Sequence, residues 1–238
     1  MKNDKNALKE LQHSLENLKG NLHVLEINIP VEKQMEYFRF SEAIKNNLSD
    51  NPPVEEQISI LDSTESSPSE IKYALAFLAV SGNVKAYRAI ETYNKTHNDE
   101  WSAMSYMQAK ITLESELSDE KQVFISTGLG GKGNRLRFFA FFGSQGMKNF
   151  SDYQKELINK EIPYYIQNYQ GIIEEIHIRD NYFTLLFLIH IQVDIKTMLE
   201  EVIDECNQYG DFINKGFIIT NVKVFTDEEI QSELMRKE

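Results

Sequence analysis

The residues best suited to chemistry lie in one basic, glycine-rich stretch of an otherwise acidic chain. Between Lys121 and Ser151 the sequence has no carboxylate, whereas the whole 238-residue chain carries a net charge of −12. Glycine loops that expose backbone N–H groups beside lysine and arginine are typical of anion sites. The stretch therefore indicates contact with an anion or an acidic partner. The expected contact residues are Gly128, Gly130, Gly131, Lys132, Gly133, Asn134, Arg135 and Arg137.

The spacing of these glycines argues against a nucleotide-binding loop. A dinucleotide fingerprint or a P-loop needs a strand, then the glycines, then a helix whose N-terminus meets the phosphate. Here Gly133 is followed by a strand-like run from Leu136 to Phe142, and no Gly-Lys-Ser/Thr occurs. Two interpretations stay open: a hairpin whose glycines only satisfy turn dihedrals, and a loop that contacts an anion or an acidic partner.

A second loop, 143–151, lies between that strand and the start of a predicted helix. Backbone amides and the helix dipole favour an anion at such a place, although the spacing matches no phosphate motif and a plain structural connection is the alternative. An eight-residue strand would hold the two loops about 26 Å apart, so one small ligand cannot touch both. The secondary candidates are Gly143, Ser144, Gly146, Lys148 and Ser151.

Residues for catalysis or metal binding are scarce. The histidines include no close pair with metal-ligand spacing, and there is no CxxC or HExxH motif. Cys206 lies on the apolar side of a predicted helix, where a packed core thiol is expected. We therefore predict no metal, no cofactor and no catalytic residue, and we favour a binding protein over an enzyme.

Composition limits the class of protein. The length suits two domains, and 41% hydrophobic with 26% charged residues is typical of a folded chain. A single cysteine allows no intrachain disulfide, which fits a reducing compartment. The longest apolar run, Phe183 to Ile191, is too short to cross a bilayer, and the polar first ten residues lack a secretory signal. We expect a cytoplasmic protein that makes no membrane contact.

The periodicity changes near Ser118 and predicts two domains, 1–118 and 119–238. In the first domain, Ser67 to Glu70 forms a capping box that opens a buried helix, and further helices follow at 84–94 and 101–117. The short links between them resemble those of HEAT-type helix pairs, as an architectural analogy. Residues 1–118 are therefore predicted to form an all-helical interaction domain.

The start of the chain allows two interpretations. Leucines from Leu8 onward keep the three-four spacing of a coiled coil as far as Ile29. However, Gly20 and Asn21 interrupt this pattern, and Leu25 to Ile29 alternates like a strand. A helix from about Asn6 to Leu18 packed on its own domain is the alternative, and residues 22–29 stay ambiguous between helix and strand.

Strands and helices alternate in residues 119–238, where a capping box at Ser151 and a cap at Asp194 begin two predicted helices. Their order, ββαββαβ, predicts an α+β domain with a mostly antiparallel, ferredoxin-like sheet that has one added N-terminal strand. That added strand lacks an evident partner, because the strand after the glycines would already have two neighbours. The hairpin therefore projects beyond the sheet, or the topology is a variant. The predicted strands are 123–127, 136–142, 172–178, 182–193 and 217–225, the predicted helices 151–169, 195–208 and a short one from Thr226, and the basic glycine-rich hairpin loop spans 128–135.

The turn at Asp180 and Asn181 predicts a register for the strands beside it. Ile178 should lie opposite Phe183, and His177 opposite Thr184, so that apolar residues meet on one face and polar residues on the other. We expect the helical domain or a second subunit to cover the polar face. The residues predicted for that face are Glu175, His177, Arg179, Tyr182, Thr184, Leu186, Leu188 and His190, joined by Asn221 and Lys223 on the last strand.

These observations favour a non-catalytic cytoplasmic binding protein, an adaptor or regulator within a macromolecular assembly. The helical domain and the basic glycine loop are its predicted contact surfaces, and its expected partner is another protein or an assembly. One alternative is a regulatory domain or enzyme that binds a small anion, a nucleotide or another phosphate-bearing ligand. A further alternative is an RNA- or ribosome-associated factor, and self-association into a homo-oligomer is also open.

Overall fold

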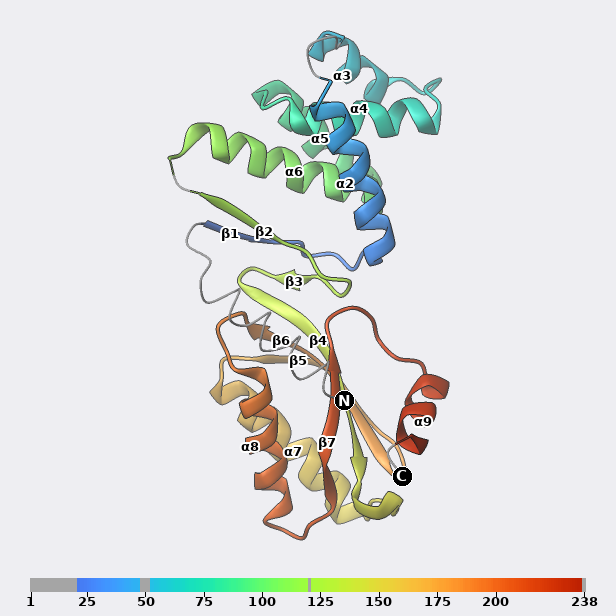
Figure 1. Cartoon of the computed structure of the whole chain (residues 1–238), viewed down its shortest axis with the longest axis vertical. Helices are drawn as coiled ribbons and strands as arrows, with labels where there is room; N and C mark the ends of the chain where they lie inside the picture. The colour runs from blue at the N-terminus through green and yellow to red at the C-terminus, as the bar shows by residue number, and fades with distance from the viewer. Residues whose placement is uncertain (1–20, 48–51, 120, 237–238) are drawn as a thin grey trace. The chain divides into compact units, whose positions relative to one another are not determined.

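The computed structural model describes residues 21–47, 52–119 and 121–236 (Figure 1). These residues divide into two compact units, one up to Ser126 and one from Thr127 onward, called here the helical unit and the sheet unit. The chain thus combines helices with an antiparallel sheet, as the sequence predicts. Among the described residues, no helix has the length and apolar character needed to cross a bilayer.

Helix α4 is the centre of the helical unit. Every residue from Ala74 to Val80 is buried, because α4 packs against each of the other helices of the unit. It begins at the predicted capping box, in which Ser67 and Glu70 bond to each other's backbone N–H groups. The helices of this unit are α2 (Val31–Lys45), α3 (Val54–Asp62), α4 (Pro68–Val80), α5 (Val84–His97) and α6 (Glu100–Leu117).

Strands β1 (Asn21–Val24) and β2 (Gln122–Ile125) form a parallel pair in the helical unit, and this pair corrects two predictions. The coiled-coil seam does not continue through residues 21–29, which form a strand and then an irregular segment whose Leu25 and Ile29 are buried. The strand predicted at 123–127 does not form a hairpin across the glycines, because it pairs with β1. The helix predicted at 6–18 lies outside the described residues.

The sheet unit contains an antiparallel sheet in the order β7-β4-β6-β5. Strand β6 pairs with nearly the whole length of β4 along one edge. Along the other edge of β4, β3 pairs with its first residues and β7 with residues from Phe139 onward. At the glycines, this edge of β4 therefore pairs only with the two-residue β3. The predicted strand that lacked a partner in this sheet is β2, which pairs with β1 instead. The strands are β3 (Gly131–Lys132), β4 (Arg135–Ser144), β5 (Ile172–Ile178), β6 (Tyr182–His190) and β7 (Ile213–Thr220).

The last strand is shifted from its predicted position of 217–225. Strand β7 begins at Ile213, where the Asn207 side chain accepts hydrogen bonds from the N–H groups of Phe212 and Ile213. After Thr220 the chain leaves the sheet, so Asn221 and Lys223 are not strand residues. An apolar run that pairs and one that covers a sheet have similar composition, which explains the error.

Helices α7 (Asp152–Asn168) and α8 (Ile195–Asn207) pack side by side over one face of the sheet (Figure 1). Phe142 and Phe183 lie on this face and stack with ring centroids 4.7 Å apart. Both helices begin at predicted caps: a capping box at Ser151 and the side chain of Asp194. This face is therefore the main core of the sheet unit.

The opposite face, called here the groove face, carries Phe139 and Phe141 of β4 and the predicted polar side of the β5–β6 hairpin. The predicted register is confirmed, since His177 pairs with Thr184 and Ile178 with Phe183. Helix α9 (Asp227–Met235) and the segment 221–226 cover the β4 side of this face. The chain's own C-terminal helix thus provides part of the cover expected from the helical domain or a second subunit.

Candidate functional site

The predicted glycine loop is a tightly packed hairpin. Leu129 is buried against Phe139 and Phe141. A Cβ atom at Gly128 would lie 1.9 Å from the Val222 carbonyl oxygen, so only glycine allows this close approach. Gly130 has a positive φ of 65°. These two glycines let the chain place Leu129 over the sheet.

Three backbone N–H groups of this hairpin bond within the protein. Leu129 N–H donates to the Asn221 carbonyl at 3.0 Å, and Gly130 N–H donates to the Thr127 carbonyl at 3.2 Å. Arg137 N–H in turn donates to the Gly130 carbonyl at 3.0 Å. These amides are therefore not directed at an external anion, in contrast with a phosphate-binding loop.

Arg137 fixes the hairpin to strand β5. Its guanidinium donates to both carboxylate oxygens of Glu174, with Nη2 2.8 Å from Oε1, and Nη1 donates to the Leu129 carbonyl at 2.7 Å. Glu174 lies at a bulge in β5, where the register shifts between Ile173 and Glu175. The bond to Arg137 lowers the pKa of Glu174, and the bond to Glu174 raises the pKa of Arg137. Arg137 is thus used for internal structure.

The remaining predicted residues lie around the turn of the hairpin. Arg135 donates from Nε to the Gln170 carbonyl at 3.1 Å. Lys132 and Asn134 are exposed, and Gly133 between them has a positive φ of 56°. The hairpin therefore does bring Lys132, Asn134 and Arg135 together, but it leaves the turn as its only broadly exposed part among the described residues.

The second predicted loop lies at the other end of β4. The N–H of Ser144 donates to the Asn181 carbonyl at 2.8 Å, and the N–H of Phe150 donates to the Asp180 carbonyl at 2.6 Å. Its short 3₁₀ helix η2 (Gln145–Met147) contains Gly146 at a positive φ of 63°, and Lys148 is exposed. Ser151 caps α7, whose first turn already holds the carboxylate of Asp152. The favourable position for an anion is therefore partly filled by the chain itself.

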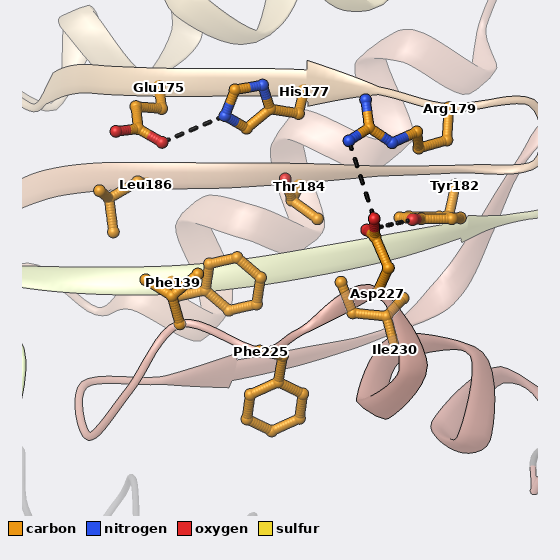
Figure 2. Close-up of a pocket in the computed structure, with 11 residues that line it drawn as sticks. Phe139, Glu175, His177, Arg179, Tyr182, Thr184, Leu186, Phe225, Asp227 and Ile230 are labelled. Carbon is orange, nitrogen blue, oxygen red and sulfur yellow. Dashed lines mark hydrogen bonds and ion pairs between the residues drawn. The ribbon is translucent and has the colours of Figure 1, made fainter.

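A groove on the groove face brings together polar and apolar side chains from β4, from the β5–β6 hairpin and from residues 224–230 (Figure 2). One hollow of about 120 Å³ lies between the β5–β6 hairpin and α9. A second, open hollow of about 450 Å³ shares Arg179, Tyr182 and Asp227 with it and extends to Lys155. The apolar residues of the first hollow are Phe139, Leu186, Val224, Phe225 and Ile230, and its polar residues are Glu175, His177, Arg179, Tyr182, Thr184 and Asp227.

Asp227 organises the polar side of this groove. Tyr182 is buried and donates from its hydroxyl to Asp227 Oδ1 at 2.8 Å, while Arg179 Nη2 lies 4.0 Å from Asp227 Oδ2 (Figure 2). Burial and the bond to Asp227 raise the pKa of Tyr182, so its hydroxyl stays protonated at neutral pH. His177 Nε2 lies 3.1 Å from Glu175 Oε2 at the rim. The groove is thus prearranged by its own hydrogen bonds.

Groups of both charges lie along the rim of the groove. Glu175 and His177 on β5, and Arg179 just after its end, have half-exposed side chains. Burial raises the pKa of the Cys206 thiol to about 12, which disfavours the reactive thiolate. Among the described residues, no three His, Cys, Asp or Glu side chains are placed to hold a metal ion. The groove can therefore bind a ligand that carries both charged and apolar groups, because charged side chains lie beside an apolar floor.

The sequence located half of this groove. The hairpin register placed Glu175, His177, Arg179, Tyr182 and Thr184 on one face, and the strand pairing confirms it. His190 lies opposite Arg135 at the other end of β4 and β6, outside the groove. The residues that were missed are Val224, Phe225, Asp227 and Ile230. The sequence predicted a short helix from Thr226, and Thr226 and Glu229 form a capping box there, but a helix-start signal does not say where the helix packs.

No protein-family model matches the sequence, and no curated protein matches it significantly. The geometry of the sheet unit therefore carries the functional argument.

Proposed function

We propose that this chain is a non-catalytic cytoplasmic binding protein, an adaptor or regulator within a macromolecular assembly, whose groove accepts a segment of a partner polypeptide. The observation that supports it is the groove itself, in which Phe139, Leu186 and Phe225 form an apolar floor beside the charges of Glu175 and Arg179. An apolar centre with a polar rim is the usual composition of protein-binding surfaces.

The charges of the groove favour a polypeptide over a nucleic acid. The groove holds Arg179 beside the two carboxylates of Glu175 and Asp227, whereas nucleic-acid interfaces have an excess of positive charge. Small-molecule pockets usually enclose several hundred cubic ångströms, but the first hollow holds about 120 Å³ and the second is open. Side chains of an extended partner suit two shallow adjoining hollows better than an enclosed small ligand does.

The finer fold assignment is part of the same proposal. The order β7-β4-β6-β5, with α7 following β4 and α8 following β6, supports a ferredoxin-like plan for residues 119–238. The helical domain, 1–118, would provide a second contact surface. In this proposal the sheet unit recognises a peptide segment, and the helical domain contributes further contacts to the assembly.

The turn of the glycine hairpin supports a second candidate function. Lys132 and Asn134 are exposed there beside Arg135, which would suit a small phosphate-bearing ligand or an RNA backbone. This candidate uses fewer residues than the sequence suggested, because Arg137 is bonded to Glu174. Thermal stabilisation by phosphometabolites and steep weakening of RNA binding with salt would be its signatures.

The test is affinity purification of the full chain at low salt with two matched pairs of substitutions. His177→Ala/Arg179→Ala alters exposed groove residues, and Lys132→Ala/Arg135→Ala alters the hairpin turn. A protein partner that is lost with the first pair and kept with the second supports the groove. Loss of a partner, RNA or phosphometabolite only with the second pair supports the alternative. Recovery of no partner by the unmodified chain contradicts the adaptor proposal.

A further inference from the structure

The outer edge of strand β5 has hydrogen-bonding groups that face away from the sheet. Arg179 N–H donates to the Tyr182 carbonyl at 2.8 Å, and the register continues without a bulge from Ile178 to Glu175. In an antiparallel ladder the inward and outward groups alternate, so the N–H and C=O of Ile176 and Ile178 point outward. Within the described ranges, β5 is the last strand of the sheet and no other strand pairs with this edge.

The residues of this edge are self-complementary. Glu175, Ile176, His177, Ile178 and Arg179 read acid, apolar, histidine, apolar, base. When two copies lie antiparallel about His177, each Glu175 faces the Arg179 of the other copy. In the same register the outward groups of Ile176 meet those of the other Ile178, which completes the ladder.

The geometry of the side chains suits this register. Glu175 is 56% exposed and Arg179 is 52% exposed, and both lie on the groove face. Opposite charges across two strands stabilise the pair, and like charges destabilise it. A register centred on Glu175 would oppose the two glutamates, and one centred on Ile176 would oppose Glu175 to His177. The register about His177 alone among these three pairs each glutamate with an arginine.

We propose that the chain self-associates through antiparallel pairing of the β5 edges of two copies, centred on His177, so that two sheets join into one. An exposed edge strand is a template for such pairing, and the charge pattern selects a second copy as the occupant. The interface is short and consists of one ladder, so it forms a weak dimer. This inference does not rest on the polypeptide partner proposed above, although Glu175 and Arg179 serve both proposals.

The experiment is sedimentation equilibrium of the full chain with charge reversals. Arg179→Glu opposes glutamates in both pairs, and Glu175→Arg opposes arginines, so each variant alone should weaken the dimer about tenfold or more. An equimolar mixture of the two single variants restores two opposite-charge pairs, as does the double variant Glu175→Arg/Arg179→Glu. Both should dimerise like the unmodified chain. Lys160→Glu on α7, with a 79% exposed side chain and the same change in charge as Arg179→Glu, is the control and should leave the dimer unchanged.

Three results would overturn the proposal. The first is an unmodified chain that stays monomeric at a concentration on the order of 100 μM, a range that reveals weak complexes. The second is a dimer that tolerates both single reversals, which would mean another surface or another occupant of the edge, such as the chain's own residues 1–20. The third is failure of the mixture to associate. If a variant fails to fold, hydrogen exchange of the unmodified chain decides, because dimerisation must protect the amides of Ile176 and Ile178 increasingly as protein concentration rises.

Discussion

The glycine hairpin and the groove belong to the same unit but use their charges in different ways. In the hairpin, Arg137 and Arg135 bond to a carboxylate and a carbonyl of the sheet unit. In the groove, the rim residues Glu175 and His177 keep half of their side-chain surface exposed. Charged residues that cluster in the sequence are therefore not all available to a ligand, because Arg135 and Arg137 are hydrogen-bonded within the folded protein.

The glycines show the same difference between packing and exposure, and they give the largest expected effect. Gly128→Ala should destabilise the protein by about 3 kcal/mol, because the new Cβ atom meets backbone that cannot move aside easily. Gly133→Ala should cost about 1 kcal/mol, since its positive φ is unfavourable but no atom lies within 4 Å. Urea denaturation measures both. Equal losses would mean that Gly128 is not the packing residue.

Arg137 is the next way to test the hairpin. Arg137→Ala leaves the Glu174 carboxylate and the Leu129 carbonyl without their donor in a partly buried setting. We expect a loss of about 2 kcal/mol in the free energy of unfolding. Arg135→Ala, which removes one exposed bond, should cost less than about 1 kcal/mol. A similar loss of stability for both substitutions would mean that Arg137 does not fix the hairpin to β5 more strongly than Arg135 does.

The Glu174–Arg137 pair also predicts a pH dependence. The pKa of Glu174 is lowered by its bond to Arg137, so its contribution to stability is present above its ordinary pKa and is lost as pH falls through the lowered value. The difference in unfolding free energy between the unmodified protein and Glu174→Gln should therefore shrink as pH falls below about 4.5. Denaturation curves from pH 7 to pH 3 test this. A difference that grows on acidification would give the opposite sign and refute the assignment.

In the groove, the corresponding test is a smaller one. Tyr182→Phe removes the hydroxyl that bonds to Asp227, and we expect a loss of about 1 kcal/mol. Tyr164→Phe, on an exposed tyrosine of α7, is the matched control and should change stability by less than about 0.5 kcal/mol. Thermal unfolding compares the two. A loss no larger than that of the control would mean that Asp227 does not organise the groove through Tyr182.

The features predicted well from the sequence depend on neighbouring residues. The capping boxes at Ser67 and Ser151 each lie within one helical turn, and the two-residue turn at Asp180 and Asn181 fixes the register beside it. These signals are local, so no tertiary information is needed to recognise them.

The features that the sequence did not predict depend on distant packing. Strand β1 pairs with β2, which lies about one hundred residues later in the chain. The composition of the two strands does not indicate that they pair. Phe225 belongs to an apolar run that could equally have extended β7, but it covers the groove face. Only the β5–β6 side of the groove could therefore be predicted from the sequence. Its other wall is formed by α9, and where this helix packs depends on tertiary contacts.

We expect the groove, and not the glycine hairpin, to contact the protein partner. Photo-crosslinking tests this expectation directly, with a photoreactive amino acid placed at position 177 in one sample and at position 132 in the other, two exposed sites of the same unit. We predict that position 177 crosslinks to a partner polypeptide and that position 132 does not; a product of twice the chain mass reports self-association separately. Crosslinking to the partner from position 132 alone would contradict the account.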